Sequence, residues 1–185
     1  MGKSYIFFAP GFEEIEALTT LDILRRGGLD VETVAITDGG KEVEGAHGVN
    51  VEADLLPAQA DIDSAEWLIC PGGMPGAKNL AESTFVTQSL LKHNAAGGRI
   101  AAICASPALV LTPLGILDGK DATCYPGMEP KDSKVNMTGQ PVVVLDRIIT
   151  GNGPANTFRF ALAILKKTIG EEGASQVASG LLFKD

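Results

Sequence analysis

The stretch RIAAICASPALVL, residues 99–111, contains Cys104, the residue best suited to covalent chemistry. An apolar run typical of a buried strand ends at this cysteine, and Ala105 and Ser106 then precede a proline that favours a first helical turn. Backbone N–H groups at such a turn favour a negative charge, and the thiolate is the nucleophilic form of cysteine. We expect the turn to lower the pKa of Cys104, as in a nucleophile elbow; the alternative is a buried cysteine that acts as a small apolar residue.

Two backbone donors are expected beside this thiol. The segment CPGGMPG, residues 70–76, follows another apolar run and reads on its own as a plain turn. If it lies next to Cys104, the N–H groups of Gly73 and Ala105 form a pair of donors for an oxyanion.

Glu16 is the candidate proton carrier. Glu13, Glu14 and Glu16 fall in the first turn of an expected helix, where solvated acids are common. Glu16 differs because it lies near the apolar positions of that helix, at the end of the sheet where sites form. A carboxyl beside a thiolate stays protonated, has a raised pKa and donates a hydrogen bond to sulfur, which makes it a general acid.

Other chemical patterns are weaker. Cys70 and Cys124 are interpreted as structural, since neither precedes a helix start. The segment GNGPAN, residues 151–156, is similar to a dinucleotide-binding loop but lacks its third glycine and contains a proline, so we expect a turn. No CxxC motif occurs and the two histidines lie far apart, so we expect no metal site.

Strands and helices alternate along the chain. Apolar runs predict strands at 4–9, 31–36, 66–70 and 99–104, a hairpin at 141–150 that turns at Asp146 and Arg147, and helices at 13–28, 83–98, from about Pro107 and at 156–170. The apolar positions expected to face the core are Ile15, Leu18, Leu21 and Leu24 in the first helix and Phe158, Leu162, Leu165 and Ile169 in the last. Ser83 is the expected N-cap of the helix at 83–98. The order predicts an α/β sandwich with a mostly parallel sheet and helices on both faces, whose ligands bind beyond the carboxyl ends of the strands, at the loops after Ala9, Cys70 and Cys104.

The composition limits the class of protein. The 185 residues predict one domain, 1–185, and the net charge of −8 argues against nucleic acid or an anionic membrane surface as partner. No apolar run approaches the roughly 18 residues that span a bilayer, and the first residues do not have the pattern of a signal peptide. Three scattered cysteines do not indicate a disulfide framework, which favours a cytoplasmic protein.

Four segments in this order resemble the ThiJ/PfpI superfamily, in the branch of the parkinsonism-associated deglycase and the bacterial YajL-like proteins. They are APGFEEIEALTTLDILRRGGLDV at 9–31, LICPGGMPGAKNL at 68–80, GGRIAAICASPALVL at 97–111 and ITGNGPANTFRFALAIL at 149–165. The resemblance implies a flavodoxin-like three-layer sandwich with a small antiparallel hairpin, no cofactor and usually a homodimer. It also implies that Cys104 is the reactive cysteine, that Glu16 is the protonated glutamate bonded to it, and that Gly73 and Ala105 supply the facing amides.

Further positions follow from the same resemblance. Arg26 matches an arginine that reaches the site across the dimer interface in relatives, and His47 falls where relatives often carry a second one. Tyr125 stands where the deglycase protein has a histidine, so it is a weak donor or a pocket wall. Ala105 stands where peptidase relatives carry a histidine, which argues against a Cys–His protease.

These residues are compatible with three functions. The first is cofactor-independent conversion of small dicarbonyls, methylglyoxal or glyoxal, to lactate or glycolate, with repair of early glycation adducts as a variant. The second is an oxidative-stress sensor or chaperone that works through oxidation of Cys104. The third, a cysteine peptidase or amide hydrolase, is the least favoured.

Overall fold

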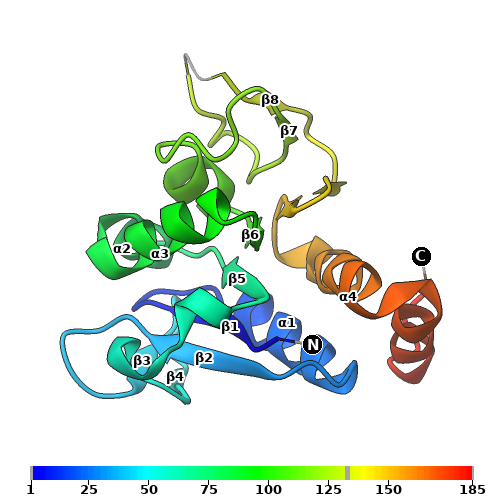
Figure 1. The fold of residues 1–185 in the computed structure, drawn as a ribbon, viewed down its shortest axis with the longest axis horizontal. Coiled ribbons are helices and arrows are strands. Elements are labelled where there is room, and N and C mark those ends of the chain that lie inside the picture. Colours follow the sequence, from blue (N-terminus) through cyan, green and yellow to red (C-terminus); the bar gives the residue numbers. More distant parts are fainter. Residues whose placement is uncertain (1, 132–133, 185) are drawn as a thin grey trace.

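The computed structural model describes residues 2–131 and 134–184 and contains a six-stranded sheet (Figure 1). The strand order is β2-β1-β5-β6-β10-β9, in which β10 and β9 pair antiparallel and the other neighbours pair parallel. The strands are β1 (Ser4–Phe8), β2 (Val31–Ala35), β5 (Trp67–Cys70), β6 (Arg99–Ile103), β9 (Val142–Val144) and β10 (Ile148–Gly151). The predicted α/β fold and its hairpin are therefore confirmed.

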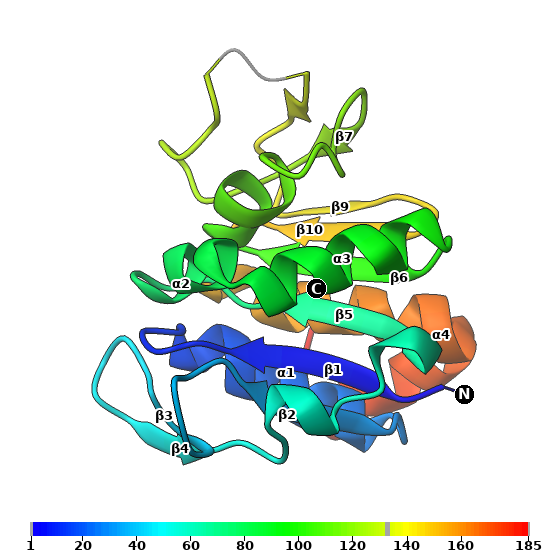
Figure 2. The same ribbon diagram turned by 60° about the vertical axis from the view of Figure 1, so that its left-hand side comes forward.

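Helices cover both faces of the sheet, with α2 and α3 in front and α1 and α4 behind in the view of Figure 2. Their bounds are α1 (Glu14–Arg26), α2 (Gly76–Glu82), α3 (Thr84–Ala95) and α4 (Thr157–Gly180). Alternate residues along a strand point into two different hydrophobic cores. In β1, Ile6 and Phe8 belong to one core, and Tyr5 and Phe7 belong to the other. The parallel central strands are buried on both faces, which explains their continuous apolar sequences.

Several smaller elements lie at the edges of this sandwich. The strands β3 (Glu42–Glu44) and β4 (Asn50–Glu52) form a hairpin that sequence analysis did not predict, and β7 (Asp121–Ala122) pairs with β8 (Asn136–Met137). Short 3₁₀ turns lie at Pro57–Gln59, Ile62–Ser64 and Pro154–Asn156. None of the helices in the described part of the chain is long and apolar enough to cross a membrane.

Two helices differ from the sequence prediction. The helix expected from Pro107 is only a five-residue π-helical segment, Pro107–Leu111. In α4, Leu165 is buried as predicted, but Phe160 and Ile164 are buried too and Phe158 is only partly buried, so the predicted face is right in part. Apolar residues occur all around this helix, so its sequence does not show clearly which face is buried. Packing against the sheet determines that face.

The prediction for the apolar stripe of α1 is right in part. Leu24 is buried as predicted and Leu18 and Leu21 pack against the core, whereas Ile15 is 54% exposed. The ends of this helix behave as predicted: the Glu13 side chain caps it by accepting a hydrogen bond from the Glu16 N–H, and basic residues occupy the last turn. The predicted cap of α3 is confirmed too, since Ser83 accepts from the Val86 N–H.

Candidate active site

Cys104 occupies a strained turn directly after β6. Its φ of +64° lies in the left-handed region, which costs a residue other than glycine about 1–3 kcal/mol. The surrounding chain holds it there, because its N–H donates to the Gly151 carbonyl at 2.9 Å and its carbonyl accepts from the Tyr125 N–H at 2.8 Å. Strain that is maintained on both sides of one residue is typical of functional sites.

The predicted backbone donors lie beside this thiol. The N–H groups of Gly73 and Ala105 both interact with the Cys104 sulfur and favour its charged form. Gly73 can reach this place only as glycine, since its φ is +91° and a Cβ would lie 2.4 Å from the Glu13 nitrogen. The loop after β5 is therefore packed tightly against both the cysteine turn and the start of α1.

Glu16 reaches the same place from the first turn of α1. It is fully buried, and its Oε2 accepts a hydrogen bond from the Gly72 N–H at 2.8 Å. Its Oε1 is buried without a hydrogen-bond partner among the described residues. Burial raises the pKa of Glu16 to about 7, against the opposing effects of the hydrogen bonds from the Cys104 thiol and the Gly72 amide.

The expectation that the turn lowers the pKa of Cys104 is wrong for this chain. Burial comes first and the Glu16 charge second in raising the pKa of the thiol to about 12, and the Gly73 and Ala105 amides only reduce the rise. The physical reason is that Pro107–Leu111 is too short to supply the dipole of a regular helix, while the thiol is 7% exposed.

Cys104 and Glu16 must therefore be treated as one acid. Two negative charges cannot lie side by side in a buried site, so the pair loses its first proton near pH 7 and keeps the second far into the alkaline range. Between these limits the pair carries one proton and one charge. When sulfur bonds to a carbonyl carbon, that proton moves to Glu16.

A cavity of about 670 Å³ opens onto Cys104. Its walls come from the start of α1, the β3–β4 loop and the turns after β5, β6 and β10, and it is lined by Glu13, Glu14, Ile15, Ala46, His47, Val49, Gly73, Met74, Cys104, Tyr125 and Pro154. The structure thus brings Cys104, Glu16, Gly73, Ala105, Tyr125 and His47 to one place. Tyr125 is 47% exposed and forms part of the wall.

Arg26 does not join this group within the chain. It lies ten residues after Glu16 in the same helix, which corresponds to about 15 Å along the axis. Its guanidinium is bound to Asp22 at 2.6 Å and faces solvent.

Sequence analysis missed a pair at the rim of the cavity. Glu14 accepts from the His47 backbone N–H through Oε1 at 2.6 Å and contacts His47 Nδ1 through Oε2 at 2.7 Å. The two residues are 33 positions apart, so no local spacing signals the contact. Glu13, Glu14 and His47 lie close enough to share a cation, but both Glu14 oxygens are already bonded to His47, and we assign no metal ligand here.

The other two cysteines lie in different surroundings. Burial raises the pKa of Cys70 to about 12 and that of Cys124 to about 11. Neither lines the cavity around Cys104. For Cys124, the charge of Glu129 adds to the effect of burial on the pKa.

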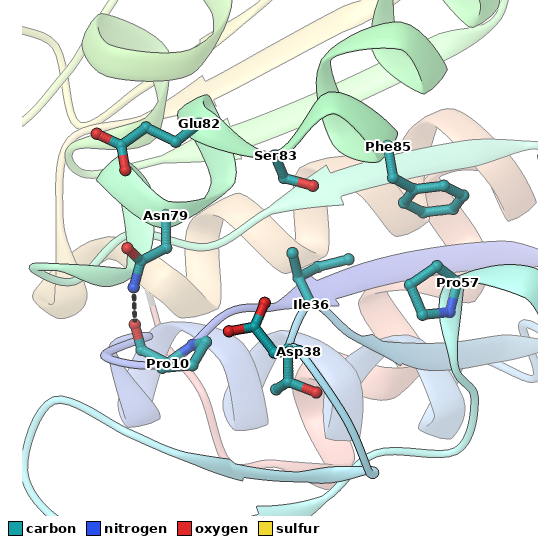
Figure 3. Close-up of a pocket in the computed structure, with 9 residues that line it drawn as sticks. Pro10, Ile36, Asp38, Pro57, Asn79, Glu82, Ser83 and Phe85 are labelled. Carbon is teal, nitrogen blue, oxygen red and sulfur yellow. Dashed lines mark hydrogen bonds between the residues drawn. The ribbon is translucent and has the colours of Figure 1, made fainter.

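A second cavity, of about 480 Å³, opens at the carboxyl ends of β1 and β2 (Figure 3). Asn79 donates to the Pro10 carbonyl at 2.8 Å at one end, and Pro57 and Phe85 lie at the other. Asp38 also lines this space and is exposed to solvent. No cysteine or histidine lines it.

Comparisons with known proteins agree on one family. The sequence model of the DJ-1/PfpI family matches residues 2–167. The chain is 38% identical to Protein dj-1beta of Drosophila melanogaster over 98% of both chains, and 33% identical to the Caenorhabditis elegans protein named glutathione-independent glyoxalase DJR-1.2 over 91% of this chain and 89% of that one. Among solved structures it is similar to oxidized DJ-1 of Toxoplasma gondii, with a TM-score of 0.93, 36% identity and full coverage of both chains.

Proposed function

We propose, from the premise that this chain belongs to the DJ-1/PfpI family, that it converts small dicarbonyls to hydroxy acids without a cofactor. The observation that carries the proposal is a strained cysteine that lines an open cavity and is hydrogen-bonded to a buried carboxyl of pKa about 7. A family member with 33% identity is named a glutathione-independent glyoxalase, which supports this substrate class.

The first step forms a bond between sulfur and the aldehyde carbon of methylglyoxal. The thiol proton moves to Glu16, and the oxygen of that carbon becomes an oxyanion that the Gly73 and Ala105 amides stabilise. Glu16 then gives its proton to the oxyanion, which yields a hemithioacetal and leaves a carboxylate ready to act as a base.

The second stage moves a proton between the two carbons. Glu16 removes the proton of the former aldehyde carbon, the electron pair forms an enediolate, and Glu16 returns the proton to the neighbouring carbon. One carbon is oxidised and the other reduced, so no external oxidant is required. Water hydrolyses the resulting thioester, which releases lactate and restores the thiol.

The test is turnover of methylglyoxal by the reduced protein, with lactate measured as product. We expect lactate to form with the unmodified protein and not with Cys104→Ala, while Cys124→Ala serves as the matched control. Absence of lactate from protein whose Cys104 is shown to be reduced removes the proposal.

An oxidative-stress role is a second candidate, because the Cys104 thiol lines an open cavity. The structural relative from Toxoplasma gondii is described as oxidized. Peroxide would convert Cys104 to the sulfenic and then the sulfinic acid, with the Gly73 and Ala105 amides facing the new oxygens. Equal rates of oxidation at all three cysteines, measured by peptide mass spectrometry, would count against this role.

We also propose that the chain is a single domain that forms a cytoplasmic homodimer. Ile15 and Val49 are 54% and 47% exposed and lie beside the cavity, on the side of α1 that the core does not cover. A partner placed on this stripe would bury it and could bring its Arg26 to the site. Light scattering on Ile15→Lys tests the assembly, and a dimer that persists unchanged argues against this surface.

A further inference from the structure

The dicarbonyl chemistry leaves one oxygen without a partner. When Glu16 removes a proton from the hemithioacetal, negative charge collects on the second carbonyl oxygen, which lies one carbon further from sulfur. The Gly73 and Ala105 amides face the sulfur side of the substrate, so they serve the first oxygen. A proton donor elsewhere in the cavity wall is needed for the second.

Among the described residues that line the cavity, His47 alone carries an imidazole, and its ring is held in place. Glu14 binds it twice, at the backbone N–H and at Nδ1, and the Glu14 side chain is only 11% exposed. A carboxylate at Nδ1 fixes the proton on that nitrogen and leaves Nε2 as the free end of the ring. The ring itself is 71% exposed, so Nε2 is open to a ligand.

The chain around this pair is built to hold it. The β3–β4 loop docks on the segment before α1, where the Ala46 N–H donates to the Phe12 carbonyl at 2.8 Å. A Cβ on Gly45 would lie 2.4 Å from Glu14 Oε1, so glycine is required for the carboxylate to reach the loop. The contact between Glu14 and His47 thus depends on two segments that fit closely.

We propose that the Glu14–His47 pair is a second proton-transfer group, in which His47 Nε2 donates a proton to the second carbonyl oxygen of a bound dicarbonyl; this inference rests on the proposed function. The protons in this step balance. His47 protonates the enediolate oxygen, and the proton lost from the first hydroxyl when the thioester forms restores the imidazolium through solvent.

The charges around His47 favour proton transfer over binding of an anion. Glu14 and Glu13, both at the start of α1, face the ring, and together they raise the pKa of His47. The side chains of Glu13 and Glu14 make this rim acidic, and the other titratable groups of the site are Cys104, Tyr125 and, beside the thiol, Glu16. Uncharged dicarbonyls are therefore the substrates that fit.

The experiment measures kcat for methylglyoxal against pH in wild type, His47→Gln, His47→Arg and Glu14→Gln. We expect His47→Gln to lower kcat about 100-fold, the usual scale of a general acid, and to lose the alkaline limb of the profile. Glu14→Gln should move that limb to lower pH, because the carboxylate that raises the pKa of His47 is gone. His47→Arg keeps the charge without an easily released proton and should be as slow as His47→Gln.

Controls separate this inference from the proposed function. Lys78→Gln breaks an exposed ion pair with Glu82 outside the cavity and should leave kcat unchanged. Alkylation of Cys104 by iodoacetamide should stay within about twofold in His47→Gln, which shows that the nucleophile is intact. Turnover that Cys104→Ala abolishes but His47→Gln leaves intact overturns this inference alone, as does full activity of His47→Arg; a wild type without turnover overturns both proposals.

Discussion

The cavity at Cys104 and the cavity at Asp38 open at the carboxyl ends of the same sheet, yet their chemistry differs. In the first, a strained cysteine and a fully buried glutamate share a proton beside two backbone donors. In the second, Asp38 is exposed, and Asn79 donates a hydrogen bond to the Pro10 carbonyl. A position at the carboxyl ends of the strands is enough to form a cavity. A reactive side chain in that cavity also requires burial and close packing.

The glycines of the β5 loop account for much of this difference. A Cβ on Gly72 would lie 2.5 Å from the Cys104 Cβ and 2.7 Å from Glu16 Oε2. The side chains of Cys104 and Glu16, which come from two separated segments, can therefore approach each other only because Gly72 has no side chain. The Asp38 cavity is lined instead by bulkier residues that include Pro10, Pro57 and Phe85.

The largest expected effect contrasts the two cavities directly. Cys104→Ala should lower methylglyoxal turnover by about 10⁴-fold or more, because it removes the nucleophile. Asp38→Asn, which alters the other cavity, should leave turnover unchanged. Steady-state assays of both variants make the comparison, and a large loss in Asp38→Asn would break it.

Removing the shared proton should be the next largest effect. Glu16→Gln keeps the shape of the side chain but cannot accept the thiol proton, so turnover should fall by about 10³-fold. In the residual activity of the variant, the rise in turnover with pH near pH 7 should be absent. Retention of that rise in the variant would show that another group causes it.

The same substitution should stabilise the protein at neutral and alkaline pH. The folded chain keeps the Glu16 proton up to a pKa of about 7, while an unfolded chain loses it near the ordinary glutamate pKa of 4.5, so stability falls as pH rises through this window. Glu16→Gln removes this slope and should gain up to about 3 kcal/mol above pH 7 and little below pH 4. Urea unfolding at both pH values measures it, and an equal effect at both contradicts the assignment.

A smaller effect separates backbone strain from close packing. Gly73 and Gly28 both have positive φ, +91° and +77°, but a Cβ meets the Glu13 backbone at Gly73 and nothing within 4 Å at Gly28. Gly28→Ala should cost about 1 kcal/mol of unfolding free energy from the conformation alone. Gly73→Ala should cost clearly more, and equal losses would show that the packing of this loop is not decisive.

The sequence was most informative where one local cause decides the structure. Continuous apolar runs located the parallel strands, and Ser83 marked the start of α3, because burial on both faces and capping are local signals. The exposure of Ile15 and the contact between Glu14 and His47 could not be predicted, since each depends on segments distant in sequence. The predicted direction of the Cys104 pKa shift was wrong for a similar reason, because the depth at which a thiol is buried depends on the whole fold.

The most direct test of the shared proton is the rate of alkylation of each cysteine against pH, read by peptide mass spectrometry in wild type and Glu16→Gln. The account predicts that reactivity of Cys104 rises through about pH 7 and then levels off, that Glu16→Gln lacks this step, and that Cys124, with a pKa of about 11, shows none. A Cys104 that rises with pH like Cys124, or a step near pH 7 that survives in Glu16→Gln, would contradict it.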